Sequence, residues 1–262
     1  MSHFTTDDQA ALRDAAAVFA RKEIEPLAAR IDREERTPPE LAAKVAEQGF
    51  LGLFIPEEYG GAGADLTSCC LVLEELAKAS PAFAGLLSVQ MILCPEVILA
   101  VGNEEQKRRL LPPSARGERV MAYSQTEPAG AGNTPFHQTK LTPDGNGWRL
   151  NGAKLFCTQG EAKTYLVMCR TERDGVQGYG CVIVEQEADG FQVAPYEDKL
   201  GWRGTNTGPI SFTDIAITPE NVVGDLLTGN SDFFMIANQS SFHGHAATSL
   251  GGAVGMFAKT LA

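Results

Sequence analysis

Apolar side chains recur every three or four residues through the first 116 residues, which is the period of an amphipathic helix. In the opening segment Leu12, Ala16 and Phe19 share one face, and the polar run Thr5–Asp8 before them can cap the helix. Pro26 predicts a kink or an end to the first part of this helix. Further helices are expected over Pro38–Phe50, Leu66–Ala79, Ser80–Val101 and Asn103–Leu111, the last ending by Pro112-Pro113, with a Gly- and Pro-rich loop at Leu53–Gly63.

The period changes to two after residue 117. Short runs of β-branched and aromatic residues are separated by turn residues such as Asp144-Gly145-Asn146-Gly147, and Asn151-Gly152 is a hairpin turn signal. About six strands at this spacing predict a β-barrel or sandwich. The expected strands are Val120–Thr126, Trp148–Thr158, Tyr165–Arg170, Gly178–Glu185, Phe191–Pro195 and Ile210–Thr218.

The last segment, residues 229–262, returns to a helical pattern rich in small residues. It reaches Ala262 with no Gly cap and no Pro, so we expect a C-terminal helical partner that this sequence lacks. The fold class is therefore α+β, with an N-terminal helical domain (1–116), a middle β-barrel domain (117–228) and the start of a C-terminal helical bundle (229–262).

Composition narrows the class of protein. The 262 residues are 44% apolar and 21% charged, which is ordinary for a globular chain. We read no apolar run long enough to span a membrane, and residues 1–30 lack the apolar core of a signal peptide. The net charge of −11, with no basic patch, argues against nucleic-acid binding. A negatively charged ligand would have to be attracted by local cations or backbone amides.

Cysteine usage indicates a reduced, cytoplasmic protein. None of the six cysteines forms a C-x-x-C pair, and no His lies at ligand spacing from one, so we expect no metal site. They are interpreted as mostly buried, small apolar residues. They are Cys69, Cys70, Cys94, Cys157, Cys169 and Cys181.

A glycine-rich segment, Tyr123–Asn133, is the sharpest candidate for chemistry. It follows a predicted strand, and its backbone N–H groups can approach a ligand closely while Thr126 offers a hydroxyl. Such a loop suits a polar ring edge or a phosphate. It is neither a Walker motif nor a dinucleotide fingerprint. A plain glycine-rich hairpin turn remains the alternative.

Two further segments carry candidate residues. In Leu150–Gly160 the strand ends in Phe156 and Thr158, which could stack on a planar cofactor and bond a ring nitrogen; the alternative is that Phe156 is core. In Lys199–Thr207 we interpret Trp202 as structural, whereas Arg203 either meets an anion or lies on the surface.

Seven segments in this order resemble the acyl-CoA dehydrogenase family over nearly the whole chain. They match the family's G-L-x-x-I-P-x-E-Y-G-G-x-G, G-T-E-E-Q-K with L-P, T-E-P-x-A-G-S-D, L-N-G-x-K, W-I-T, K-L-G-x-R and P-x-E-N-x-L-G patterns. In this chain they are Leu53–Gly63, Gly102–Lys107 with Leu111-Pro112, Thr126–Asn133, Leu150–Lys154, Phe156–Thr158, Lys199–Arg203 and Pro219–Gly224.

The resemblance implies an activity and a cofactor. Family members are FAD flavoproteins that oxidise acyl-CoA thioesters to 2,3-enoyl-CoA in fatty acid metabolism. A glutamate takes the α-proton, the flavin takes the β-hydride, and electrons pass to an electron-transfer flavoprotein. FAD lies between the β-domain and the C-terminal helices, and the family is usually a homotetramer. We therefore expect an FAD-dependent oxidoreductase acting on acyl-CoA, in a homotetramer or hetero-oligomer.

The same resemblance assigns site residues. The loop residues Tyr123, Gln125, Thr126 and Gly132 are expected to line the flavin, with Thr126 at the pyrimidine edge, and Gly132 also to meet the substrate. Phe156, Cys157 and Thr158 are expected beside the ring, with Thr158 nearest N5. The substrate wall would include Leu86, Leu87, Val89, Gln90, Met91 and Cys94.

The direction in which the Gln90 side chain points distinguishes two kinds of substrate. If its amide faces the pocket, the acyl group should carry a polar group, since a buried amide without a partner costs roughly 1–3 kcal/mol. If it faces a neighbouring helix or solvent, the wall is apolar and a plain fatty acyl-CoA fits.

Departures from the family pattern keep a second function open. Gly132 replaces the usual Ser, Phe156 replaces the usual Trp, and Ser241 and Phe242 stand where an acid-Arg pair is expected. The catalytic glutamate is not found, so the base is unknown and the 262-residue chain alone is expected to be inactive. His243 and His245 are titratable but are more simply packing or surface residues. The alternatives are a flavin-containing lyase, a non-catalytic subunit, or a pure binding module.

Overall fold

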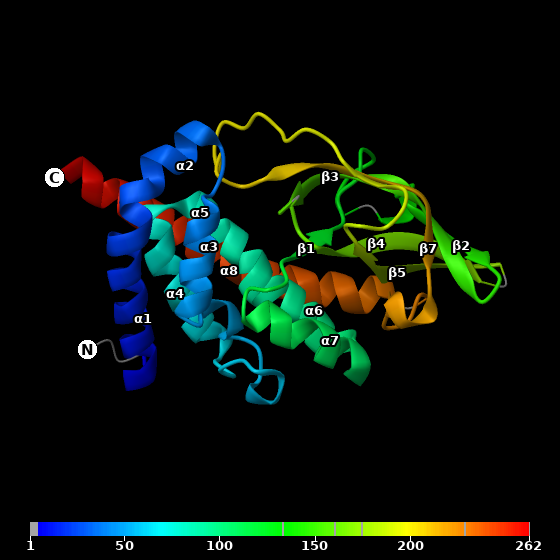
Figure 1. The fold of residues 1–262 in the computed structure, drawn as a ribbon, viewed down its shortest axis with the longest axis horizontal. Coiled ribbons are helices and arrows are strands. Elements are labelled where there is room, and N and C mark those ends of the chain that lie inside the picture. Colours follow the sequence, from blue (N-terminus) through cyan, green and yellow to red (C-terminus); the bar gives the residue numbers. More distant parts are fainter. Residues whose placement is uncertain (1–4, 133, 160, 174, 228, 262) are drawn as a thin grey trace.

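The computed structural model describes residues 5–261 except 133, 160, 174 and 228, and gives only the backbone for 173, 229–235 and 237–241. A helical part, a sheet and one long last helix follow each other along the chain (Figure 1). The helices are α1 (Asp7–Phe19), α2 (Ala28–Glu34), α3 (Pro39–Glu47), α4 (Leu66–Ala79), α5 (Pro81–Ser88), α6 (Cys94–Val101), α7 (Glu104–Ala115) and α8 (Gly229–Leu261).

Side-chain caps set where the helices begin. Thr6 accepts from the backbone N–H of Gln9 at 3.2 Å, and the Gln9 side chain accepts from the N–H of Thr6 at 3.0 Å. Asn103 and Gln106 form the same reciprocal pair before α7. The predicted break at Pro26 is confirmed, because a wide and then a tight helical turn separate α1 from α2 there.

The predicted end of α7 at Pro112-Pro113 is wrong. The helix continues to Ala115, and the carbonyls of Pro112 and Pro113 accept from the N–H groups of Arg116 and Glu118 at 3.3 and 2.9 Å. Proline lacks the donor but keeps the acceptor, so two prolines in the last turns leave the C-terminal hydrogen bonds intact.

The prediction that no apolar run could span a membrane is also corrected. The stretch Pro81–Val101 is long and apolar enough by composition, with Glu96 as its only charged residue. However, 72% of its most apolar window is buried inside the fold, so it is a core helix (α5, a wide turn and α6).

The middle of the chain forms one eight-stranded mixed sheet. Its order is β6-β7-β3-β2-β4-β5-β8, and β1 pairs with β4. The pairings β1–β4 and β2–β4 are parallel and the others antiparallel. The strands are β1 (Met121–Ser124), β2 (Lys140–Asp144), β3 (Gly147–Thr158), β4 (Thr164–Arg173), β5 (Val176–Glu185), β6 (Phe191–Val193), β7 (Thr207–Ile217) and β8 (Val222–Val223).

The hairpin turn expected at Asn151-Gly152 is not present. Strand β3 passes straight through these residues, with a register shift against β7 between Leu150 and Gly152. Gly152 has φ +147°, and a Cβ there would lie 2.5 Å from Cα of Thr139. The extra residue of this shift lies in β7, where Asp214 has φ +55°, so the glycine marks a close backbone approach opposite a bulge and not a turn. The sequence reading also missed β2 and the two-residue β8.

Helix α8 connects the two halves of the molecule. It runs from the sheet, past α6 and α4, towards α1 (Figure 1). Glycines allow this close passage, because a Cβ on Gly251 or Gly255 would collide with the backbone carbonyl of Glu74 or Lys78 in α4. Several apolar side chains of α8 are largely exposed: Phe242, Leu250, Met256, Phe257 and Leu261.

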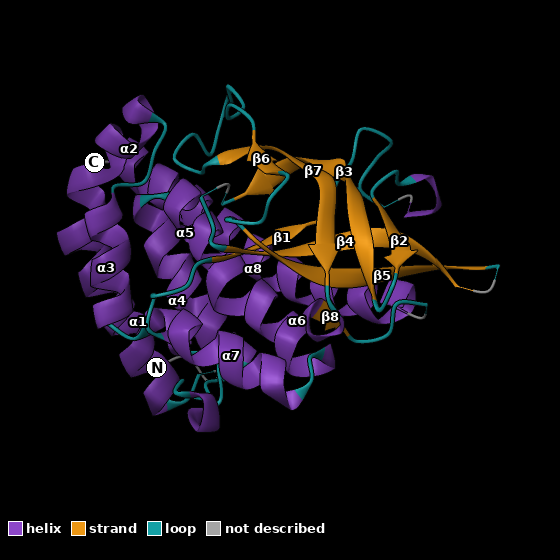
Figure 2. Cartoon of the chain, turned by 45° about the vertical axis from the view of Figure 1, so that its right-hand side comes forward, coloured by secondary structure: helices purple, strands orange, loops and turns teal. Residues whose placement is uncertain are grey.

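The sheet is docked directly on the helices (Figure 2). One buried cluster combines Val97 and Leu111 from the helices with Met121, Leu166 and Ile183 from the strands. This shared core fixes β1, and therefore the loop that follows it, relative to the helical part.

Candidate cofactor site

The loop after β1 is joined to the end of β3. The backbone N–H of Leu155 donates to the carbonyl of Thr126 at 2.8 Å, and the Ser124 Oγ and Cys157 Sγ atoms lie 3.0 Å apart. Two segments that sequence reasoning singled out separately, 123–133 and 156–158, therefore form one site.

Phe156 projects outwards at this junction. It has φ +53°, lies at a register shift between β3 and β7, and is 55% exposed. The interpretation of Phe156 as core is therefore wrong. A left-handed conformation at a non-glycine residue is uncommon and is found where a side chain is re-aimed. The exposed ring offers a flat apolar surface beside Thr158, the last residue of β3.

Cys157 points the opposite way, into the sheet core. It is 1% exposed, and burial raises the pKa of its thiol to about 11. The thiol is therefore neutral at physiological pH and is no nucleophile. All six cysteines are free, and only Cys70 is not fully buried, as the sequence predicted.

The crest of the loop, residues Gly130–Gly132, is open on its outer side. A Cβ placed on Gly130 or Gly132 would meet no atom within 4 Å. Gln125 links the two ends of the loop, since its Nε2 donates to the carbonyl of Ala131 at 3.0 Å and its Oε1 accepts from the hydroxyl of Tyr123 at 3.0 Å. Asn133 lies outside the described residues. The open backbone leaves room for a ligand to approach the crest.

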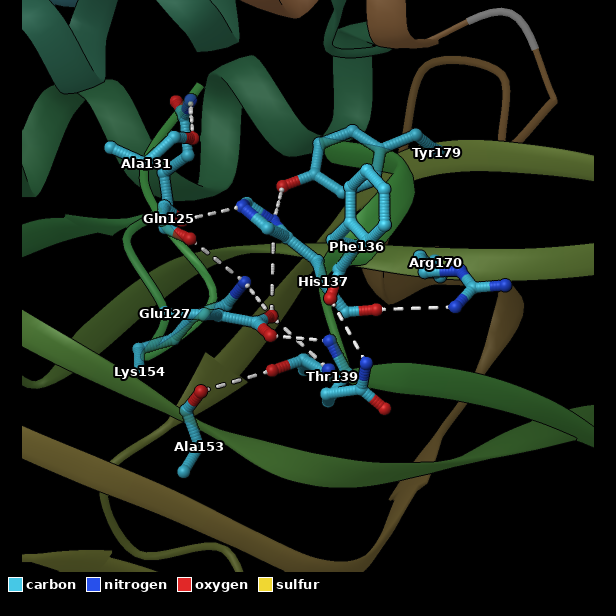
Figure 3. A network of polar contacts seen from close by, with 12 residues as sticks. Gln125, Glu127, Ala131, Phe136, His137, Thr139, Ala153, Lys154, Arg170 and Tyr179 are labelled. Carbon is cyan, nitrogen blue, oxygen red and sulfur yellow. Dashed lines mark hydrogen bonds and ion pairs between the residues drawn. The ribbon is translucent and has the colours of Figure 1, made fainter. Parts of the chain in front are cut away.

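Beneath the loop lies a buried ion pair. The side chains of Glu127 and Lys154 are both 0% exposed, and Nζ of Lys154 donates to Oε1 of Glu127 at 2.7 Å and to the carbonyl of Gln125 at 3.0 Å. Glu127 also accepts from the backbone N–H groups of Thr139, at 3.1 Å, and Gln138. Figure 3 shows the two side chains pointing toward one another. The pair ties the loop to β3 and to the segment before β2.

The charges of this pair are held in place by their surroundings. Burial tends to raise the pKa of Glu127, but the Lys154 ammonium and the backbone donors lower it below its ordinary value overall. Burial lowers the pKa of Lys154, and Glu127 offsets part of that shift. The lowered pKa of Glu127 keeps its carboxylate charged at neutral pH.

His137 completes the buried network. Its Nε2 lies 2.9 Å from the carbonyl of Gly130 and its Nδ1 lies 2.6 Å from the hydroxyl of Tyr179 (Figure 3). Burial and the nearby Lys154 lower the pKa of His137, so the ring is neutral at pH 7. Sequence reasoning missed His137, Lys154 and Tyr179 as site residues. The available signal was the alternation of side chains along a strand, which places Lys154 on the same face as the core residue Leu150 and so predicts that it is buried.

Gln90 lies away from this loop. Its Nε2 donates to Oγ of Ser114 at 2.6 Å and to the carbonyl of Arg119 at 3.0 Å, and its Oε1 accepts from the N–H of Met121 at 2.8 Å. Both ends of the amide are committed to neighbouring elements, which is the second of the two placements considered. Gln90 thus bridges the wide turn before α6 and β1, while it also lines a cavity with Leu86 and Leu87, and its substrate-binding role stays a prediction.

Segment 199–207 is structural, as expected for Trp202. The Trp202 ring lies over Gly85, where a Cβ would come within 2.7 Å of Cη2, and it stacks on His245 at 5.8 Å. Arg203 donates to the carbonyl of Lys199 and pairs with Glu35, so it links the sheet to the helical part. Among the described residues, no group of three His, Cys, Asp or Glu side chains is placed to hold a metal ion.

The sequence and the fold match known proteins. The model of the acyl-CoA dehydrogenase N-terminal domain matches residues 6–118, and that of the middle domain matches residues 122–215. The short-chain specific acyl-CoA dehydrogenase of Clostridium acetobutylicum is 36% identical over 221 residues, which cover 84% of this chain and 58% of the relative. The mitochondrial isobutyryl-CoA dehydrogenase of Dictyostelium discoideum is 33% identical over 95% of this chain and 60% of its own length.

Solved structures of related proteins have the same fold. Butyryl-CoA dehydrogenase from Megasphaera elsdenii has a TM-score of 0.92 at 30% identity, covering all of this chain and 70% of that chain. A chain from a structure of the electron transferring flavoprotein of Acidaminococcus fermentans has the same TM-score at 35% identity, covering 98% and 68%. The chain belongs to the acyl-CoA dehydrogenase family, and it spans about 60% of the length of the curated relatives.

Proposed function

We propose that the protein is an FAD-dependent oxidoreductase that dehydrogenates an acyl-CoA thioester at the α,β bond to the 2,3-enoyl-CoA. The observation that carries this proposal is the open glycine loop fixed beside the exposed Phe156 ring at the end of β3. Membership of the family supports it, as do relatives named for butyryl-CoA and isobutyryl-CoA dehydrogenation.

The residues present fit a flavin. A planar ring needs an apolar surface to stack on, and Phe156 offers one that is 55% exposed. It needs polar groups at its edge, and Tyr123, Gln125, Thr126 and Thr158 lie around the same junction. It needs backbone that can approach closely, and Gly130 and Gly132 leave that space open.

In this assignment Tyr123, Gln125, Thr126 and Gly132 line the cofactor, Phe156 stacks on its ring, and Thr158 bonds its edge. Cys157 supports the junction from within the sheet. FAD, when bound, supplies the acceptor for a hydride. The chain contributes position and exclusion of water, and Gly132 leaves space where the family's usual Ser would meet the acyl-CoA.

The remaining chemistry is a proton transfer. The α-proton of a thioester is a weak acid, so its removal needs a desolvated carboxylate and donors at the thioester oxygen. Among the described residues of α8, Phe242 has no group that can accept a proton and His243 is exposed, so neither supplies a desolvated carboxylate. We assign no catalytic base within these residues.

Further assignments rest on the family. We propose the division 1–116, 117–228 and 229–262 as N-terminal, middle and first C-terminal parts, an electron-transfer flavoprotein as acceptor, a homotetrameric or hetero-oligomeric assembly, and a cytoplasmic location. The Acidaminococcus structure, named for an electron transferring flavoprotein, supports the acceptor.

A second candidate is a family member with altered or no dehydrogenase chemistry. The exposed Phe242, in place of the expected acid-Arg pair, and the bare Gly132 favour it. A relative named 3-(aryl)acrylate reductase, 33% identical to this chain, supports such variation within the family.

The test is anaerobic bleaching of the flavin absorbance by a panel of acyl-CoAs, using the protein in its natural length. Dehydrogenation predicts rapid bleaching by at least one saturated acyl-CoA, with butyryl-CoA and isobutyryl-CoA first in the panel. Flavin that binds but resists bleaching by every member would favour the second candidate. A protein that holds no flavin after FAD is supplied would contradict both.

A further inference from the structure

The imidazole of His137 is held in one tautomer. The carbonyl of Gly130 can only accept, so Nε2, at 2.9 Å from it, must carry a proton. In the neutral ring Nδ1 is then an acceptor, and it takes a hydrogen bond from the Tyr179 hydroxyl at 2.6 Å. The opposite tautomer would set two lone pairs against each other at Gly130. The carbonyl of Gly130 therefore keeps the proton on Nε2, and the Tyr179 hydroxyl holds the ring in place through its hydrogen bond to Nδ1.

His137 reaches the loop crest from below. Gly130 also exchanges two backbone hydrogen bonds with Glu127, at 2.9 and 3.2 Å, but Glu127 lies at the buried base of the same turn. The other side chain bonded to the crest is Gln125, whose amide holds Ala131 from the exposed side. His137 thus anchors the crest to the rigid strand β5, through Tyr179.

Such an anchor changes the free energy of ligand binding. A crest with two glycines has many conformations in the free protein, and binding would have to remove that freedom. Fixing the carbonyl of Gly130 beforehand removes part of this entropic cost, which is how preorganisation raises affinity.

We propose that His137, oriented by Tyr179, is a positioning residue for the flavin. It holds the carbonyl of Gly130 so that the segment Gly130–Gly132 is preshaped for the cofactor, without itself touching it. This inference rests on the proposed function, because it assumes that the loop binds FAD.

Paired substitutions of His137 distinguish a role in positioning the loop crest from a general role in the stability of the fold. Gln places its amide nitrogen near the position of Nε2, whereas the shorter Asn reaches only the position of Nδ1. We expect His137→Leu and His137→Asn to raise the Kd for FAD about 10-fold, from loss of a preorganising hydrogen bond. His137→Gln should stay within about threefold of wild type for the same reason. Gln138→Ala, at an exposed neighbouring side chain, is the matched control and should leave the Kd unchanged.

The experiment measures FAD affinity by quenching of FAD fluorescence, with thermal unfolding of each apo variant alongside. Nitrogen-15 NMR of labelled histidine checks the tautomer without cofactor: wild type should show the Nε2–H form, because the carbonyl of Gly130 can only accept. A Kd for His137→Leu within twofold of wild type, or equal values for the Asn and Gln variants, would overturn the inference alone. Wild-type protein that binds no FAD would overturn the proposed function and the inference together.

Discussion

Replacing Lys154 with Met tests the buried ion pair under the loop. Met fills a similar volume but leaves Glu127 as a fully buried carboxylate whose described hydrogen-bond donors are then the two backbone N–H groups of Gln138 and Thr139. It also removes the donor to the carbonyl of Gln125. Breaking a buried pair from one side costs about 3–5 kcal/mol. That is a large share of a total stability of roughly 5–15 kcal/mol, and we expect urea unfolding at pH 7 to show it.

The pH dependence gives the sharper signature. In wild type the pKa of Glu127 is lowered, so its stabilisation is present above the ordinary carboxyl pKa and is lost as pH falls through the folded value. Without Lys154, burial dominates and the pKa of Glu127 should rise above its ordinary value. The destabilisation by Lys154→Met should then be largest at pH 7 and shrink as pH falls towards about 5.

A double variant provides the control. Glu127→Gln with Lys154→Met removes both charges and keeps an acceptor for a backbone N–H, so it should recover at least half of the lost stability and show no such pH trend. A loss below about 1 kcal/mol for Lys154→Met, which is the scale of an exposed pair, would refute the reasoning. An equal loss at pH 5 and pH 7 would refute it as well.

Three further outcomes are expected. Thr158→Val should weaken FAD binding about 2- to 12-fold and slow flavin reduction, from loss of one hydrogen bond of roughly 0.5–1.5 kcal/mol; equal titration curves would contradict this. Gln90→Leu should lower the free energy of unfolding by about 1–3 kcal/mol, because the N–H of Met121 loses its acceptor. Activity on straight-chain acyl-CoAs should stay within a few-fold of wild type. A change in the preferred acyl-CoA would contradict a purely structural role for Gln90. Cys157, with its thiol pKa near 11, should react with a thiol reagent at pH 8 only on unfolding, and fast labelling of the folded protein would contradict its burial.

The sequence predicted the helices well because their signals are local. Caps at Thr6 and Asn103 and the break at Pro26 depend on neighbours within four residues. The errors arise where a distant contact decides. Gly152 looks like half of a turn, and only the approach of Thr139 and the register against β7 show that it is a point of close backbone contact within a strand. The two prolines of α7 look like a stop, yet their carbonyls remain available.

The two segments of the site were predictable from the sequence, but the buried residues that hold them in place were not. Motif resemblance brought the 123–133 loop and residues 156–158 together before any contact was known. It could not show that Phe156 faces outwards, because a local bulge with positive φ reverses its side. Nor could it join Lys154, His137 and Tyr179, which lie on different strands and loops and meet only through the fold. The hydrogen bonds of the Gln90 amide to Ser114, Arg119 and Met121 were unpredictable for the same reason.

The most direct measurement of the central claim is a titration of the purified protein with FAD, followed by visible absorbance and flavin fluorescence, on wild type and on Phe156→Ala. Binding at the loop and the end of β3 predicts a stoichiometric complex with a shifted flavin spectrum, and a weaker complex with an altered spectrum for Phe156→Ala, because the stacking surface is removed. No flavin binding by wild type, or the same affinity and spectrum in both proteins, would contradict the placement of the cofactor at this site.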